Sequence, residues 1–216
     1  MDIKYLGHSA FDIETNGMHI LIDPFLVCVP SYKPKDIYNI FVTHGHGDHL
    51  GSAIDISKTT GAPITAIFEL ANYCSLKGAK TIDMGLGAWK EYNWGRAILV
   101  PAFHSSKTPD GIYAGCPCGV IFDIEGTIIY HAGDTCLNSE MKMIGEVYRP
   151  DIVMLPIGGT YTMDIENAVI AAEWLGASEV IPMHYNTFDA IKVDITDFER
   201  QIREIGKIPV VKKILE

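Results

Sequence analysis

The sequence predicts an α/β fold in which two sheets are each covered by helices. Short apolar, β-branched segments dominate the first half of the chain, and helices alternate with strands from residue 139 onward. No Pro/Gly/Ser linker, repeat or long charge run divides the 216 residues, so we expect one domain over residues 1–216. Two halves of this kind pack together as a layered sandwich.

The first half begins with three short extended segments. Residues 3–6, 11–14 and 18–22 are β-like, and Asn16-Gly17 between the last two is a typical hairpin turn. The apolar, β-branched run over 40–43 has the composition of a buried strand. Beyond it we expect a helix over 51–60, a strand over 64–68 and a helix over 69–77.

The second half contains strands and helices in turn. Strands are expected over 97–101, 120–124 and 127–131, the last two joined by a turn at Glu125-Gly126. After them we expect helices over 139–148, 165–175 and 195–205, which precede strands over 152–155, 180–183 and 209–212.

Composition excludes several classes of protein. The 17 Lys+Arg against 27 Asp+Glu give a net charge of −10, which opposes binding to nucleic-acid phosphates. No run of 18 apolar residues predicts a membrane-spanning helix. The chain starts on a strand pattern without the basic and apolar regions of a signal peptide, and its five cysteines are an odd number. We therefore expect a cytoplasmic protein with reduced thiols, without nucleic-acid or membrane partners.

The stretch from Thr43 to Leu50 (THGHGDHL) carries the strongest chemical signal. Its four potential metal ligands lie within six residues: His44, His46, Asp48 and His49. A tight turn after a strand lets the first two histidines face the same way, and the glycines between them remove bulk and permit unusual backbone angles. The other two project from the start of the next helix. Imidazoles with a carboxylate suit zinc or a similar divalent ion, whereas an exposed histidine-rich turn has no reason to follow a buried strand with this spacing.

This stretch resembles the His-x-His-x-Asp-His signature of the metallo-β-lactamase superfamily, and the resemblance extends across nearly the whole chain. The sequence is most similar to a family of metal-dependent hydrolases near the L-ascorbate 6-phosphate lactonases. The further hallmarks are 5–11 (YLGHSAF), 22–25 (IDPF), 101–105 (PAFHS), 130–135 (YHAGDT) and 183–187 (MHYNT). The resemblance implies a four-layer αββα sandwich with two metals at the shared edge of its sheets.

The resemblance also implies a ligand set. His44, His46 and His104 would hold the first metal, Asp48, His49 and His184 the second, and Asp134 would bridge the two. Independently, the three distal members of this set, His104, Asp134 and His184, each follow a predicted strand. Ligands at the same end of several strands can converge on one point. Asp48, Asp134 and His184 are therefore also the catalytic candidates.

Such a centre implies hydrolysis. Two metals about 3.5–4 Å apart share a water and lower its pKa toward about 7, which makes a bridging hydroxide available as a nucleophile. The metals also polarise a carbonyl or phosphoryl oxygen. The expected substrate is a small ester, lactone or phosphoester, and the resemblance to lactonases favours a lactone or a phosphorylated compound. Zinc is expected from the ligand types, although manganese or iron can occupy the same set.

Three further polar residues are candidates to support the ligands. Ligating histidines usually donate their other N–H to a carboxylate or carbonyl. Asp23 ends the strand over 18–22 and would accept such a bond, or else simply form an Asp-Pro turn. His8 lies in the Gly-His-Ser motif near the expected site. His131 is either a second support or a hydrogen-bonded core histidine.

Other residues are candidates to contact substrate. Gly158 and Gly159 follow a strand, and their backbone N–H groups would meet an oxyanion unless they form a plain turn. Tyr185 and Asn186 lie beside His184. The pair Cys116 and Cys118 lacks the second cysteine pair of a structural zinc site, so we expect two reduced thiols in a loop.

Two other functions are compatible with this pattern. Diiron oxidoreductases share the fold, but there a glutamate typically replaces the second histidine, which is His46 here. A metal-binding regulatory module without turnover is the other alternative, and the complete ligand set argues against it. Related proteins often assemble, which is compatible with a homo-oligomer, but the sequence does not determine the oligomeric state.

Overall fold

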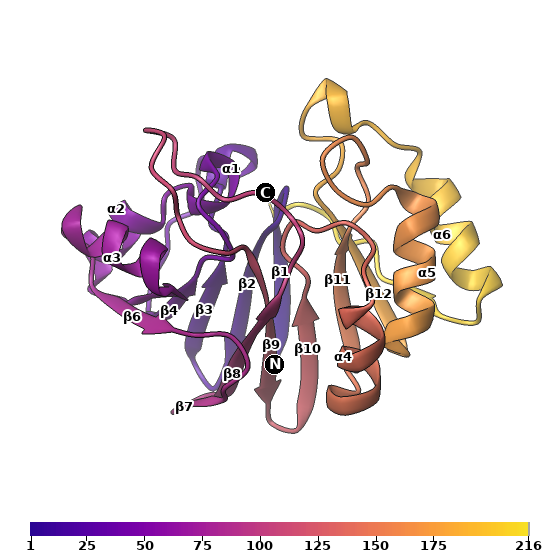
Figure 1. Cartoon of the computed structure of the whole chain (residues 1–216), viewed down its shortest axis with the longest axis horizontal. Helices are drawn as coiled ribbons and strands as arrows, with labels where there is room; N and C mark the ends of the chain where they lie inside the picture. Colours follow the sequence, from indigo (N-terminus) through magenta and orange to yellow (C-terminus); the bar gives the residue numbers. More distant parts are fainter. Residues whose placement is uncertain (216) are drawn as a thin grey trace.

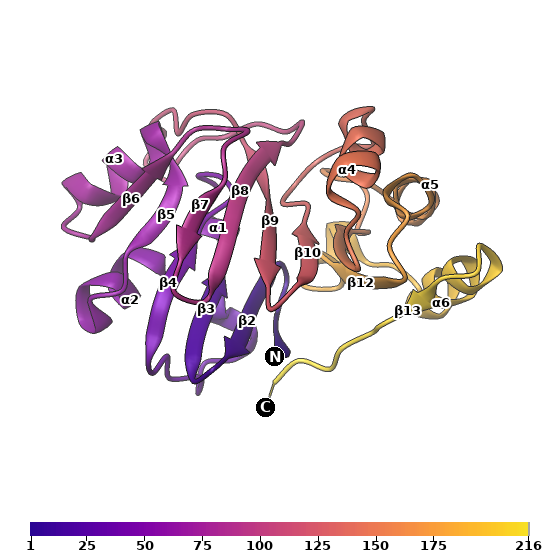
Figure 2. The ribbon, with the colours of Figure 1, turned by 90° about the horizontal axis from the view of Figure 1, so that it is seen from below.

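The computed structural model describes residues 1–215, which form two mixed sheets packed face to face (Figure 1). The first sheet has the strand order β1-β2-β3-β4-β5-β6, and the second has the order β13-β12-β11-β10-β9-β8-β7. Helices α2 and α3 cover the outer face of the first sheet, and α4, α5 and α6 cover the second (Figure 2). The predicted αββα sandwich is confirmed.

The first sheet contains the predicted hairpin and one unpredicted edge strand. Its strands are β1 (Asp2–Gly7), β2 (Ala10–Thr15), β3 (Met18–Ile22), β4 (Ile37–Phe41), β5 (Ile64–Ile67) and β6 (Thr81–Met84). The hairpin turn has positive φ at Asn16 and Gly17, which matches the twist of the flanking strands. β1 to β3 are antiparallel, and β3 to β6 are parallel.

The helix predicted over 51–60 is present as α2, which begins two residues later, and a separate short helix precedes it. The structure has α1 (Gly47–Leu50) and α2 (Ala53–Thr60), followed by α3 (Phe68–Leu76). The break lies at Gly51, which has a φ of 44° and where an added Cβ would clash with the carbonyl oxygen of Pro24. That same carbonyl accepts a hydrogen bond from the Ser52 N–H at 3.0 Å. The loop after β3, with its short 3₁₀ helix η1 (Leu26–Cys28), therefore crosses where a continuous helix would run.

The second sheet follows the predicted order of elements. Its strands are β7 (Lys90–Tyr92), β8 (Gly95–Pro101), β9 (Cys118–Ile124), β10 (Thr127–His131), β11 (Ile152–Pro156), β12 (Glu179–Met183) and β13 (Ile208–Pro209). Its helices are α4 (Glu140–Tyr148), α5 (Ile165–Leu175) and α6 (Ile195–Glu204), with a 3₁₀ turn η2 (Asp189–Ile191). β6 and β7 were not predicted because these short edge strands carry charged and partly exposed residues. β13 is shorter than the predicted 209–212.

The space between the sheets is filled by large apolar side chains from both. Phe41 of β4 meets Phe122 of β9 edge to face, with ring centroids 4.9 Å apart. Trp94 is 3% exposed, and its indole N–H donates to the Asn39 side-chain oxygen at 3.0 Å. Close packing of this kind fixes how the two sheets lie on one another. Among the described residues, no helix has the length and apolar character needed to cross a membrane.

One edge of the sandwich gathers the loops that follow β1, β3, β4, β8, β10 and β12, seen at the top of Figure 1. β3 and β4 run parallel in the first sheet, and β10 to β12 run parallel in the second. Parallel strands bring their carboxyl ends to the same edge. Residues that follow these strands, far apart in sequence, therefore meet where the two sheets adjoin.

His131 at the end of β10 connects two of these loops. Its imidazole is fully buried, with Nε2 at 3.0 Å from the carbonyl oxygen of Ser9. The Gly133 N–H donates to the other ring nitrogen, Nδ1, at 3.2 Å. These two bonds require a neutral ring with its proton on Nε2. His131 is thus a hydrogen-bonded core histidine that holds together the turn bearing His8 and the turn bearing Asp134.

Replacing His131 by leucine tests this connection. The variant leaves a buried carbonyl and a buried N–H without partners, so we expect a loss of about 1–3 kcal/mol in the free energy of unfolding. Burial holds the pKa of His131 below its ordinary 6.5, so only the unfolded chain gains this proton as the pH falls below 6.5. Wild-type stability should therefore fall more steeply than that of the variant between pH 6.5 and pH 5. Urea unfolding of the metal-free proteins measures both effects, and equal slopes would contradict the buried neutral ring.

Candidate metal centre

The seven residues predicted as ligands lie in one cluster at the edge where the sheets adjoin, and His8 lies with them. Their ligand atoms fall into three groups, each with all members within 4.8 Å of one another: His44, His46 and His104; His44, His49 and Asp134; and His8, Asp48, His49 and His184. The convergence expected from the strand ends is therefore present.

Asp134 lies at the centre of this cluster. Its Oδ1 is 3.2 Å from His49 Nε2, and its Oδ2 is 3.2 Å from His184 Nε2. The same Oδ2 is 3.5 Å from His104 Nε2 and 3.9 Å from His44 Nε2. Burial alone would raise the pKa of Asp134, but the positive charge of His49 and the closeness of His184 outweigh burial and lower it. Asp134 is therefore a carboxylate with imidazole nitrogens close to both of its oxygens.

His44 and His46 lie together on one side of Asp134. His44 Nε2 is 3.0 Å from His46 Nδ1, and the ring of His104 stands at 5.2 Å and 5.1 Å from the two rings. Burial lowers the pKa of all three histidines, which favours the neutral form that binds a metal. This group matches the first predicted metal position.

Asp23 orients the ligands from behind. Its fully buried carboxylate accepts from His49 Nδ1 at 2.7 Å and from the backbone N–H of Thr43 at 2.8 Å. Burial would raise the pKa of Asp23, but the charge of His49 outweighs it and keeps the group ionised. The His49 proton is thereby fixed on Nδ1, and Nε2 is turned toward Asp134. Asp23 is therefore more than a turn-forming residue.

Thr43 plays a matching part for His44, and the sequence analysis did not find it. The Thr43 hydroxyl donates to Asp23 at 2.7 Å, so its oxygen is left to accept from His44 Nδ1 at 3.0 Å. With the proton on Nδ1, His44 presents a lone pair on Nε2 to the cluster. The only sign of this role in the sequence is that Thr43 directly precedes His44. A threonine hydroxyl is not a typical zinc ligand, so the residue type gives no indication of it.

Gly45 is required by a neighbouring loop. A Cβ at this position would clash with the side chain of Ala114 and press on the backbone of Lys107, and the Gly45 N–H donates to the Ser106 hydroxyl at 3.2 Å. The expected absence of bulk is therefore confirmed at Gly45. Neither Gly45 nor Gly47 has a positive φ, so the expected unusual backbone angles are not used.

Two of the predicted substrate contacts, Gly159 and Asn186, make hydrogen bonds within the chain. The Gly159 N–H donates to the carbonyl of Met163 at 2.9 Å, so it is not available to an oxyanion. Gly158 packs so closely on the backbone of His184 that a Cβ would clash there. Tyr185 packs partly buried against the core between the sheets. Asn186 shapes its own loop, because its side-chain oxygen accepts from the Val193 N–H at 2.8 Å.

The cysteines lie outside the cluster. All five are free, and Cys116 is exposed whereas Cys118 is buried in β9. The Cys118 thiol donates to the carbonyl oxygen of Thr43 at 3.2 Å. The expectation of two reduced thiols agrees with this arrangement, although Cys118 belongs to a strand rather than a loop.

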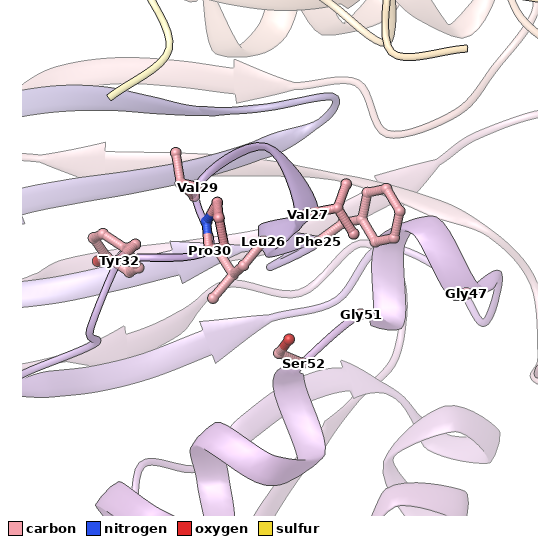
Figure 3. Close-up of a pocket in the computed structure, with 9 residues that line it drawn as sticks. All are labelled: Phe25, Leu26, Val27, Val29, Pro30, Tyr32, Gly47, Gly51 and Ser52. Carbon is pink, nitrogen blue, oxygen red and sulfur yellow. The ribbon is translucent and has the colours of Figure 1, made fainter. Parts of the chain in front are cut away.

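A cavity of about 500 Å³ lies beside α1 (Figure 3). Its nine lining residues are all uncharged, and most are apolar: Phe25, Leu26, Val27, Val29, Pro30, Tyr32, Gly47, Gly51 and Ser52. The cavity approaches the cluster at two places. Gly47 stands between His46 and Asp48 in the chain, and the ring of Phe25 packs on His8 at 5.6 Å between centroids.

The cluster has the unsatisfied atoms that a bound cation would complete. His49 Nε2 and Asp134 Oδ1 are buried without a hydrogen-bond partner and face each other at 3.2 Å. Ligands on a tetrahedral zinc lie about 3.3 Å apart, given bond lengths of about 2.0–2.1 Å. Buried polar atoms without partners are costly, so this spacing favours an ion between them. The side chains present therefore fit a divalent metal.

The variant Asp23→Asn tests the role of Asp23. It replaces one carboxylate oxygen, which accepts hydrogen bonds from Thr43 and His49, by an amide NH₂ group that cannot accept them. His49 would lose its fixed orientation, so we expect metal affinity to fall by about 10–100-fold. Asp12→Asn is the matched control, because Asp12 is also buried and also accepts from a histidine, His19 at 2.9 Å, but outside the cluster. Competition titration with a chromophoric chelator measures both. Equal affinities in the two variants would contradict the assigned role.

Comparison with known proteins agrees with the site. The family model described as the beta-lactamase superfamily domain matches residues 2–184. A UPF0173 metal-dependent hydrolase of Geobacillus thermodenitrificans is 48% identical over 92% of this chain and 91% of its own. Another, from Staphylothermus marinus, is 46% identical over 97% of this chain and 94% of its own.

A solved structure extends the similarity to three dimensions. The structure of a metallo hydrolase from the hyperthermophilic archaeon Ignicoccus hospitalis has a TM-score of 0.89 and 37% identity, and the match covers 99% of this chain and 95% of that one. Each of these three matches covers more than nine tenths of this chain and of the relative. The chain therefore belongs to the UPF0173 metal-dependent hydrolases of the metallo-β-lactamase superfamily.

Proposed function

We propose that this metal-dependent hydrolase uses a dinuclear centre to cleave a small ester, lactone or phosphoester. One observation carries the proposal: the buried carboxylate of Asp134 has imidazole nitrogens at 3.2–3.9 Å around both of its oxygens. One metal alone would leave part of this ring of nitrogens without a ligand role. Two positions, one on each side of Asp134, use them all.

The ligand assignment follows the groups in the cluster. His44, His46 and His104 would hold the first metal, Asp48, His49 and His184 the second, and Asp134 would lie between them. Five imidazoles and two carboxylates favour zinc, and the same donors accept manganese or iron. When bound, two such ions supply an activated water at neutral pH and polarise the bond to be cleaved.

The chain's own residues prepare this chemistry. Asp23 and Thr43 fix the tautomers of His49 and His44, so the ligand nitrogens need no rearrangement. Asp48 is the cluster's more exposed carboxylate, with its side chain 30% accessible. Burial would raise its pKa, but the hydrogen bond from His8 and the charge of His49 lower it overall. An ionised Asp48 at the entrance is suited to serve as a metal ligand on the side that substrate approaches.

We further propose that the cavity beside α1 receives the part of the substrate that is not cleaved. Its lining carries no charged side chain and includes the apolar side chains of Phe25, Leu26 and Val27, and Gly47 brings it next to two proposed ligands. An apolar acyl chain fits such a lining better than a phosphate does, since a phosphate would need cationic side chains there. An ester or lactone with an apolar substituent is therefore the favoured substrate class.

Metal content and two ligand variants test the dinuclear centre. Protein purified without chelator should carry about two equivalents of zinc or manganese by elemental analysis. Asp134→Ala and His46→Ala should lose metal and lower hydrolysis of activated esters by more than about 100-fold. Their circular dichroism should remain that of the folded chain. Two equivalents of iron would point instead to redox chemistry, and full activity in a metal-depleted variant would exclude the mechanism.

The substrate cavity is tested with p-nitrophenyl esters of increasing acyl length. Each buried methylene contributes about 0.8 kcal/mol, so kcat/KM should rise on the order of 10-fold from acetyl to butyryl. Val27→Asp places a charge in the cavity lining and should abolish this gain while leaving the acetyl ester unaffected. Val147→Asp is the control, because Val147 is similarly exposed, 63% against 58%, but lies on α4. The same chain-length profile in both variants would contradict the cavity assignment.

A further inference from the structure

His8 is held rigidly at the end of β1. Its backbone has a φ of 57°, in the left-handed region that most residues avoid. Its carbonyl oxygen accepts two hydrogen bonds, from the hydroxyl of Tyr5 at 2.9 Å and from the backbone N–H of His184 at 2.7 Å. The side chain is buried, with the residue 1% exposed. A strained residue that is held on all sides is typical of a functional position.

The imidazole of His8 has a partner at each nitrogen. Its Nε2 lies 3.1 Å from Asp48 Oδ2, and its Nδ1 lies 3.1 Å from the hydroxyl of Thr187. The ring also packs against that of His184 at a tilt of 45°, with centroids 4.2 Å apart, and the ring of Phe188 lies edge to face with it at 5.4 Å. His8 therefore joins three loops: the turn after β1, the start of α1 and the loop after β12.

The direction of these hydrogen bonds follows from their partners. An ionised carboxylate only accepts, so His8 Nε2 must carry the proton that it shares with Asp48. In the neutral ring Nδ1 then accepts from the Thr187 hydroxyl at 3.1 Å, a shorter contact than the one of 3.4 Å between that hydroxyl and the carbonyl of Tyr185. Both ring nitrogens are thus engaged, in contrast to His49, whose Nε2 is buried without a partner. The nitrogen of His8 that faces the cluster is a donor and has no lone pair to give to a metal.

We infer that His8 is a positioning residue for the second metal: it donates a hydrogen bond that holds the carboxylate of Asp48 in place, and it is not a ligand itself. This inference rests on the proposed dinuclear function. It explains why His8 lies among the groups of the second position, within ligand distance of Asp48, His49 and His184. Asp48 needs such support because its side chain is partly exposed. It also lies in the first turn of α1, a helix of only four residues.

Two substitutions of His8 separate a donor from a ligand. In His8→Gln the amide nitrogen can reach the place of Nε2 and donate to Asp48. In His8→Asn the amide nitrogen corresponds to Nδ1 and cannot. We expect His8→Asn to weaken binding of the second zinc equivalent by about 10–100-fold, with the first equivalent unchanged, and His8→Gln to restore most of the loss. Thr187→Val, which removes the hydroxyl behind the ring, should cost about 5-fold.

The readout is stepwise zinc titration of metal-free protein against a chromophoric chelator. His19→Asn is the matched control, because His19 also pairs with an aspartate, Asp12 at 2.9 Å, but in the β2–β3 hairpin. It should bind both equivalents as the wild type does. An unchanged second equivalent in His8→Asn overturns the inference, and so does an equal loss in His8→Gln and His8→Asn, which would make His8 a ligand.

A second measurement on the wild-type protein does not depend on any variant. Nitrogen NMR of the imidazoles, with both zinc equivalents bound, should show a proton on Nε2 of His8. A metal-bound, unprotonated Nε2 overturns the inference even if a variant fails to fold. Failure of the proposed function would give a different result. If the wild-type protein bound fewer than two equivalents of zinc, the dinuclear centre itself would be excluded, whatever the role of His8.

Discussion

A buried carboxylate surrounded by imidazoles is the constraint on which the rest of this structure depends. Asp134 is 2% exposed, and a negative charge at that depth is stable only when it is paired. The neighbouring histidines are imidazoles whose nitrogens nearest Asp134 can bind either a proton or a metal. The chain's own groups offer no hydrogen-bond partner to His49 Nε2 or to Asp134 Oδ1. The loops that follow the strands are fixed so that this costly arrangement persists.

The supporting contacts are made between loops rather than within them. Asp23, in the loop after β3, holds His49 on α1. His131 at the end of β10 holds the Ser9 carbonyl in the turn after β1, and the backbone of His8 in that turn receives the N–H of His184. Each bond crosses from one strand end to another, and two of them cross from one sheet to the other. The precision of the ligand positions therefore depends on how the sheets pack, which the aromatic contacts between them set.

Predictions from the sequence were right where local composition decides structure. The β1–β3 hairpin, the alternating second half and the order of strand ends all follow from periodicity and turn residues such as Asn16 and Gly17. Predictions were wrong where a distant segment intervenes. Pro24 lies against Gly51 and Ser52, so the helix expected over 51–60 begins only at Ala53, and Met163 takes the Gly159 N–H that was expected to face a substrate. Edge strands β6 and β7 were missed because their pairing partners, and not their own residues, make them strands.

The sequence by itself determined the chemistry of the site, because four potential ligands in six residues after a strand have few other uses. It also determined that His104, Asp134 and His184 would follow strands and so could join them. Only the tertiary structure decided which polar residues support the ligands. His8 and His19 both pair with an aspartate at about 3 Å, yet only His8 reaches the cluster. Thr43 and Thr187 give no sign of their roles until the hydrogen-bond directions are traced. The physical reason is that ligand type is a property of one side chain, whereas support depends on the distance between segments that folding brings together.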